Sequence, residues 1–145
     1  MKVKAQKHIN FEADIRINSI TLLSLDEYKK YSKKIPVIDH YWWLRSPGYY
    51  SNYAVLVNLY GAPLGFGDYV TIGCYAVRPA LVGDFKGVSE FEFASHTWIV
   101  LADNLAICKD YLFSSRFDAD NNKYETSEVK ARLNEWLKSN IESEE

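Results

Sequence analysis

Three histidines are the residues most suited to catalysis in this sequence. His8, His40 and His96 are scattered along the chain. No GxSxG-type segment supports a triad of nucleophile, histidine and acid, which stays open only as an alternative. The chain also contains neither a P-loop nor a GxGxxG segment. We therefore predict no catalytic residue.

The sequence does not predict a metal site either. Residues 118–122 (DADNN) carry oxygen ligands, but the central glycine of an EF-hand loop is missing and Val129 stands where its bidentate glutamate belongs. Cys74 and Cys108 form no CxxC pair and no Cys/His cluster at zinc spacing. We expect a solvated turn and two reduced, buried thiols, with a disulfide or a metal pair as the alternative. No metal and no cofactor are predicted.

Two tryptophans and two arginines lie in otherwise apolar segments. The rings of Trp42 and Trp43 could stack on bases or sugars, but we predict that both are core residues. We predict that Arg45 and Arg78 are structural, each satisfied by carbonyl groups or by a carboxylate. A role as anion receptors is the alternative for these two arginines.

The composition is that of a folded and slightly acidic chain. Its 145 residues suffice for one domain, and 48% hydrophobic and 25% charged residues exclude disorder over most of the length. A net charge of -2 does not fit a protein that grips nucleic-acid backbones without sequence preference. No stretch has the apolar length of a membrane span and residues 1–8 lead into no apolar run, so we expect a cytoplasmic protein. The aromatic content of 15%, with 11 tyrosines, is unusually high.

Helix and strand patterns alternate along the chain. Ser24 and Glu27 form a capping box at the start of a predicted helix over 25–32. Apolar residues at helical spacing predict a second helix over 127–141, with Thr126 or Ser127 as N-cap. We predict strands and connections at these positions: strands at 11–17, 19–23, 54–59, 69–72, 88–93, 98–101 and 105–108, a turn at 61–68, and an extended run at 76–82 with Pro79 on an edge or at a bulge.

Residues 42–48 (WWLRSPG) and 76–81 (AVRPAL) resemble the two motifs of a bacterial and phage domain family, WWLRSPG and GVRPAL. The first motif is complete, the second differs only by Ala76 in place of glycine, and residues 21–28 look like the family's lead-in. The family is placed with C-type-lectin-like folds, beside formylglycine-generating enzymes and the variable proteins of diversity-generating retroelements. The resemblance therefore implies an α+β, C-type-lectin-like domain with a mixed or antiparallel sheet and two helices. Its structural motif would comprise Trp42, Trp43, Arg45, Arg78 and Pro79.

The two halves of the chain stand in the opposite order to those of the family. The features of the family's first half are a WIVL strand, a return strand, an FD loop and a helix ending in LNxWL. Here they follow the motifs, at 98–101, 105–112, 117–118 and 126–137. We interpret this order as a circular permutation within one domain, 1–145, composed of the family's C-terminal half (1–81), a connector (82–97) and the family's N-terminal half (98–141). Domain swapping or tandem duplication is the alternative, so we expect a monomer or a domain-swapped dimer.

The known activities of the related folds do not carry over to these residues. The formylglycine-generating enzymes are oxidases that use a pair of reactive cysteines and copper. Neither Cys74 nor Cys108 aligns with that pair. Pro79 follows Arg78 where those enzymes have cysteine after arginine. The calcium-lectin segments EPN, QPD and WND are absent. The resemblance therefore implies a scaffold that presents long loops near the tryptophan and arginine motifs.

The segment after the first motif is rich in tyrosine, which supplies large contact area at low entropic cost. We therefore expect a non-catalytic binding module that recognises a protein, with no direct binding to nucleic acid or membrane. The expected partner-binding residues are Tyr49, Tyr50, Asn52, Tyr53, Tyr60, Phe66, Asp68 and Tyr69. The alternative is a phage-type inhibitor of a host defence enzyme, such as a CRISPR nuclease, acting in the host cytosol. A small enzyme with an unrecognised site is a third hypothesis.

Overall fold

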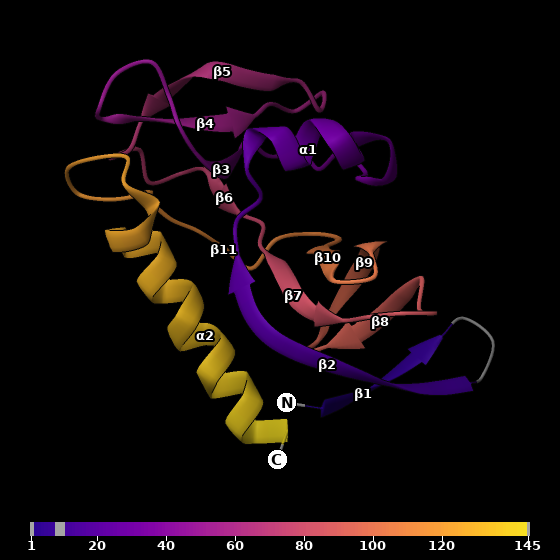
Figure 1. Ribbon diagram of the computed structural model, residues 1–145. Helices are drawn as coiled ribbons and strands as arrows, with labels where there is room; N and C mark the ends of the chain where they lie inside the picture. The colour runs from indigo at the N-terminus through magenta and orange to yellow at the C-terminus, as the bar shows by residue number, and fades with distance from the viewer. Residues whose placement is uncertain (1, 8–10, 145) are drawn as a thin grey trace.

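Two β-sheets and two α-helices build the part of the chain that the computed structural model describes, residues 2–7 and 11–144 (Figure 1). One sheet has six strands, in the spatial order β1 (Lys2–Lys7), β2 (Phe11–Thr21), β7 (Ala80–Asp84), β10 (Leu105–Cys108), β9 (His96–Ala102) and β8 (Glu90–Phe93). The other has five, in the order β11 (Phe113–Ser114), β6 (Ala76–Val77), β3 (Trp42–Pro47), β4 (Tyr53–Val57) and β5 (Pro63–Tyr69). The helices are α1 (Leu25–Tyr31), α2 (Glu128–Glu144) and the 3-10 turns η1 (Ser32–Lys34) and η2 (Tyr124–Thr126). Among the described strands, neighbours run antiparallel except for β3 and β6, so the predicted α+β class is confirmed.

Strand β2 merges the two strands predicted at 11–17 and 19–23. Its pairing with β7 shifts register between Ile17 and Ser19, so a bulge stands where the sequence predicts a break. Gly83 lies opposite this bulge, and a Cβ added there would be 1.8 Å from the carbonyl oxygen of Arg16. The close approach of the two backbones therefore requires glycine on β7.

The predicted capping box starts helix α1 and is confirmed. The Ser24 hydroxyl accepts the Glu27 amide at 3.1 Å, and the Glu27 carboxylate accepts the Ser24 amide at 2.8 Å. Tyr28 is the buried residue of this helix, and its ring meets the edge of Trp42 at a centroid distance of 5.4 Å. The cap thus fixes a short helix against the five-stranded sheet.

The hairpin of β4 and β5 differs from the prediction. Residues 61–68, predicted as a turn, contribute most of strand β5, and residues 70–72 lie beyond its end. The chain turns earlier because the Asn58 side chain accepts the amides of Tyr60 and Ala62, each at 2.9 Å. Gly67 belongs to the strand, where its φ of +86° and a hypothetical Cβ 2.5 Å from the Ala54 oxygen require glycine.

The chain passes from one sheet to the other at Arg78 and Pro79. Strand β6 ends at Val77 and β7 begins at Ala80, so the predicted extended run over 76–82 is divided between two sheets. Pro79 therefore lies between two strands and not at an edge or bulge. Its carbonyl oxygen accepts the Cys108 amide at 2.9 Å, which links the crossing to β10.

Two hydrophobic cores fill the space around the sheets. Successive strand residues point to opposite faces, and accordingly Trp43 packs in the core beside α2 while Trp42 packs in the core beneath α1. Both tryptophans are buried, and the Trp43 indole donates a 2.9 Å hydrogen bond to the Ser115 carbonyl. The double-tryptophan segment also pairs with β6, at Trp42 and Ala76.

The last third of the chain follows its prediction closely. Strands β9 and β10 form the predicted hairpin, and β8 covers most of the strand predicted at 88–93. The predicted N-cap Ser127 accepts the Lys130 amide at 3.1 Å. Helix α2 runs along β2 (Figure 1) and buries Val129, Leu133 and Leu137 against the sheet.

The two cysteines are free and have different environments. Cys108 is buried in β10, as predicted, whereas Cys74 is exposed, so its predicted burial is wrong. Cys74 lies in the loop between β5 and β6, in a stretch that pairs with no strand. Cys74 is therefore a surface-loop residue and not a core residue.

Candidate functional site

Five aromatic side chains gather at one end of the five-stranded sheet, at the β3–β4 loop (residues 48–52) and the β4–β5 hairpin. We call them the aromatic patch: Tyr49, Tyr50, Tyr53, Phe66 and Tyr69. Tyr49 and Phe66 stack with centroids 5.0 Å apart and planes inclined by 6°. Tyr50 meets Phe66 edge to face at 5.7 Å, and Tyr53 contacts Tyr69 at 4.6 Å. Aromatic pairs of this kind contribute about 0.5–1.5 kcal/mol beyond the area that they bury.

The backbone beneath the aromatic patch is fixed by hydrogen bonds between the loop and the hairpin. The Tyr49 amide donates to the Phe66 carbonyl at 2.8 Å, and the Gly48 amide donates to the Tyr53 carbonyl at 2.7 Å. A Cβ at Gly48 would lie 2.6 Å from the Phe66 oxygen, so glycine is needed for this approach. The loop is therefore held in place by backbone contacts within the chain.

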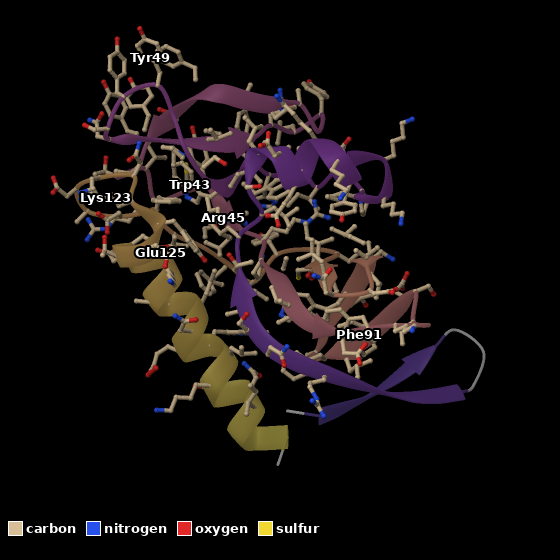
Figure 2. The ribbon with its side chains drawn as sticks, viewed as in Figure 1. Trp43, Arg45, Tyr49, Phe91, Lys123 and Glu125 are labelled. Atoms are coloured by element: carbon tan, nitrogen blue, oxygen red, sulfur yellow. The ribbon has the colours of Figure 1, made fainter. Side chains whose placement is uncertain are left out.

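The aromatic patch faces solvent although it is largely apolar. The exposed fractions are 71% for Tyr49, 55% for Phe66, 51% for Tyr50 and 49% for Tyr69. Figure 2 shows Tyr49 projecting from the end of the molecule, outside the ribbon. Contiguous exposed apolar side chains of this kind mark interaction sites more often than scattered ones do.

Hydrogen bonds also order the polar groups around the aromatic patch. The hydrogen bond to Tyr69 is the main cause that raises the pKa of Tyr53 to about 12. The Asp68 carboxylate accepts hydrogen bonds from the Tyr75 hydroxyl at 2.6 Å and from the Tyr69 backbone amide at 2.8 Å. Burial and this carboxylate both raise the pKa of Tyr75. Asp68 therefore orders a neighbouring ring, and its oxygens are engaged within the chain.

The eight residues expected to bind a partner do not all meet. Five form the aromatic patch, and Asn52 and Asp68 border it, with the Asn52 carbonyl accepting the Val70 amide at 2.9 Å. Tyr60 is 86% exposed but lies in the turn at the opposite end of the β4–β5 hairpin. The structure therefore separates Tyr60 from the other seven residues.

A groove adjoins the aromatic patch and was not predicted from the sequence. It has a volume of about 530 Å³ and is lined by Arg45, Ser46, Pro47 and residues 122–126. The Asn122 side chain donates to the carbonyls of Tyr50 and Tyr53 at 3.1 and 3.0 Å, which joins the groove wall to the patch. Figure 2 shows Lys123 and Glu125 on the segment between Tyr49 and helix α2. The sequence signal for this wall is the polar run that was interpreted as a solvated turn.

The acidic loop at 118–122 supports the groove wall through backbone amides. Asp118 accepts the amides of Asp120, Asn121 and Glu128, each at 3.1 Å. Burial would raise the pKa of Asp118, but these amides outweigh it and hold the pKa below its ordinary value. The carboxylate thus shapes the turn and the start of α2, a role that differs from that of a calcium ligand.

Arg45, which lines the groove, is held by partners inside the chain. Its guanidinium donates to the Leu22 carbonyl at 2.7 Å and contacts the Glu27 carboxylate at 2.5 Å. Burial would raise the pKa of Glu27, but the Ser24 amide and Arg45 outweigh it and lower the pKa. Arg45 therefore ties β3 to the capped end of helix α1.

The histidines do not converge on one another. His8 lies outside the described residues, His40 contacts the Tyr111 hydroxyl at 3.1 Å, and His96 contacts the Asp110 carboxylate at 2.9 Å. Cys108 stands beside Asp110 as well, with its sulfur 3.0 Å from the same oxygen. Within the described part of the chain, His96, Cys108 and Asp110 are the group of side chains that could hold a metal ion.

No protein-family model, curated protein or solved structure matches this chain. None of the helices within residues 2–7 and 11–144 is long and apolar enough to cross a membrane. On the surface of the described residues, the aromatic patch and the adjoining groove are the features best suited to contact a partner.

Proposed function

We propose that the protein is a non-catalytic binding module whose aromatic patch recognises a protein partner. The observation that carries the proposal is the exposure of rings that already pack on one another above a hydrogen-bonded backbone. Rigid tyrosine and phenylalanine side chains lose little conformational entropy on binding and are typical of binding surfaces between proteins. The patch is thus organised for contact before a partner binds.

The chemistry of the surface favours a protein over other partners. The rings offer apolar faces beside phenolic hydroxyls, and the adjoining groove carries groups of both signs, Lys123 and Glu125. The overall net charge of -2 gives no attraction to a phosphate backbone. An apolar centre with a mixed polar border is the usual anatomy of an interface between two proteins.

The test compares variants of the aromatic patch with a matched surface variant. Tyr50, Tyr53 and Phe66 are replaced together by alanine, while Tyr60→Ala removes a more exposed ring outside the patch. The wild-type chain is used to capture partners from the native host, and the affinity of each variant for the purified partner is measured by calorimetry. We expect the triple variant to lose at least about 30-fold in affinity, since the loss of one central aromatic residue alone costs about 2 kcal/mol, or about 30-fold.

The melting curve is measured for the same variants. The triple variant should melt at a lower temperature than the wild type, because its three rings pack on one another and on Tyr49 and Tyr69, so its affinity is measured at a temperature where it is fully folded. Equal affinity of the triple variant and the wild type would contradict the proposal. So would an equal loss of affinity in Tyr60→Ala.

We also propose that the scaffold is a circularly permuted relative of the C-type-lectin-like domains. Support comes from the two motif segments, which meet through the Arg78 guanidinium, 5.0 Å from the Trp42 ring centroid, and through the β3–β6 pairing. Further support comes from the lead-in residues, whose Leu22 amide donates to the Tyr124 hydroxyl at 3.2 Å in the last third of the chain. An experimental structure compared strand by strand with lectin-like domains would test the relationship.

A further inference from the structure

The β9–β10 hairpin brings three potential metal ligands together. Cys108 pairs with Trp98, and the Lys109 amide donates to the Thr97 carbonyl at 2.8 Å, which continues the pairing toward His96. Side chains two residues apart on a strand share a face. This register therefore places His96 and Asp110 beside Cys108 on one face of the hairpin.

The three ligand atoms lie close to the spacing of a tetrahedral site. The His96 Nδ1 is 2.9 Å from the Asp110 Oδ1, the Cys108 Sγ is 3.0 Å from that oxygen, and Sγ and Nδ1 are 4.0 Å apart. The bond lengths of zinc to nitrogen, oxygen and sulfur give ligand separations of about 3.4–3.6 Å around a tetrahedral ion. The observed distances bracket this range, so small side-chain rotations would complete the geometry.

We propose that Cys108, His96 and Asp110 form a binding site for a divalent transition metal of the zinc class, with the fourth position open to water. Sulfur and nitrogen ligands favour zinc, cobalt and related ions over calcium or magnesium. Asp110, whose side chain is 62% exposed, gives the ion a path from solvent. The site lies on the six-stranded sheet, away from the β4–β5 hairpin (Figure 1), and does not depend on the proposed binding function.

The surroundings suit a metal-bound thiolate. The Arg78 guanidinium donates to the Cys108 carbonyl at 2.8 Å and places a positive charge near the sulfur. In the structure the thiol donates a hydrogen bond to the Asp110 carboxylate, with the sulfur 3.0 Å from the oxygen. On binding, the metal takes the sulfur lone pair and the proton passes to solvent.

The imidazole can change its tautomer to accept the ion. With Asp110 as its present partner, Nδ1 carries the proton, and metal binding at Nδ1 moves the imidazole proton to Nε2.

The His96 ring also lies 6.3 Å from the Trp136 ring, and Trp136 lies 6.1 Å from Trp98. A bound ion would therefore stand close to two indoles, which provides an optical signal.

The experiment titrates reduced, metal-free full-length protein with Co²⁺ and then displaces the Co²⁺ with Zn²⁺. We expect one equivalent to bind, with visible d–d bands of low-symmetry Co²⁺, a thiolate charge-transfer band in the near ultraviolet and quenched tryptophan fluorescence. Cys74→Ser is the control for the exposed cysteine and should leave the spectrum unchanged. Cys108→Ser should lose the charge-transfer band.

Two further variants keep the test decisive if Cys108→Ser folds poorly. Asp110→Asn and His96→Gln change partly exposed side chains, and near-ultraviolet circular dichroism checks their folding. Each should weaken Co²⁺ binding by at least about 10-fold, since even outer partners of metal ligands contribute 10- to 100-fold. A wild type that binds no Co²⁺, a charge-transfer band that depends on Cys74, or unchanged affinity in Asp110→Asn would overturn the proposal.

Discussion

The Arg78 side chain carries a charge into the space between the two sheets. The residue has no exposed surface, and its guanidinium donates to the carbonyls of Pro36, Cys108 and Lys109 at 2.8–2.9 Å. Burial lowers the pKa of Arg78, as expected for a cation withdrawn from water. The planar guanidinium reaches three carbonyls at once, which a lysine in the same place could not match.

Replacing Arg78 by leucine should be strongly destabilising. The change leaves the buried Cys108 carbonyl and the partly buried carbonyls of Pro36 and Lys109 without their donor, and an unsatisfied buried group costs about 1–3 kcal/mol. We expect the free energy of unfolding, measured by urea denaturation, to fall by about 3 kcal/mol or more. The control is Arg132→Leu, an exposed arginine over the Phe113 ring, where we expect a loss within about 1 kcal/mol. Equal losses in the two variants would contradict the role given to Arg78.

The Tyr53 hydroxyl gives a pH-dependent signal from within the aromatic patch. Its pKa is raised to about 12, mainly by the hydrogen bond to Tyr69, so the folded chain keeps this proton where an unfolded tyrosine, near 10.0, has lost it. The contribution to stability is complete below pH 10 and is lost as the pH rises through 12. In an NMR titration of the ring carbons, Tyr69→Phe should bring the pKa of Tyr53 back toward its ordinary value. Tyr60→Phe should leave the pKa of Tyr53 unchanged. An ordinary pKa of Tyr53 in the wild type would contradict the hydrogen bond.

Elements with local signals are predicted well, and those that depend on distant backbone are not. Helix α1 is predicted because Ser24 and Glu27 cap it from within four residues. Strand β5 is missed because its glycines suggest a turn, whereas Gly67 is needed for the approach of the Ala54 backbone. The neighbours of a strand become known only once the sheet has formed.

The same limit applies to the candidate sites. The tyrosines of the loop are visible in the sequence, but their separation from Tyr60 follows from the length of the β4–β5 hairpin. The grouping of His96, Cys108 and Asp110 follows from the register of β9 and β10, because the sequence spacing matches no zinc motif. Local patterns therefore predict candidate residues, and topology decides which of them meet.

The bulge between β2 and β7 should make Gly83 intolerant of any side chain. A Cβ there would stand 1.8 Å from the Arg16 oxygen, so the two strands would have to separate. We expect Gly83→Ala to lower the free energy of unfolding by about 2 kcal/mol or more, as overpacked backbone contacts do. Gly73→Ala, where an added Cβ meets no atom within 4 Å, should change it by less than about 0.5 kcal/mol. A tolerated alanine at 83 would contradict the close approach.

At the scale of the whole molecule, side-chain hydrogen bonds join segments that lie far apart in sequence. The Trp43 indole donates to the Ser115 carbonyl, and the Leu22 amide donates to the Tyr124 hydroxyl. Trp42 and Trp43 enter different cores from adjacent positions on β3. The first and last thirds of the chain therefore pack against each other within one molecule.

This internal packing predicts a monomer in solution. A circularly permuted chain completes its own core, whereas a swapped chain needs the matching part of a second copy. Light scattering coupled to size-exclusion chromatography should give the mass of one 145-residue chain over a wide concentration range. A mass of two chains at every dilution would favour the exchange of halves between copies.

The most direct test of the proposed binding function is an NMR titration of the labelled protein with a partner captured and purified by the wild-type chain. We expect the largest shifts at the ring signals of the aromatic patch, with smaller shifts at residues 122–126, which line the adjoining groove. Signals of Tyr60 and of helix α2 beyond its first turn should stay in place. Large shifts at those positions, with the five rings unperturbed, would contradict the account.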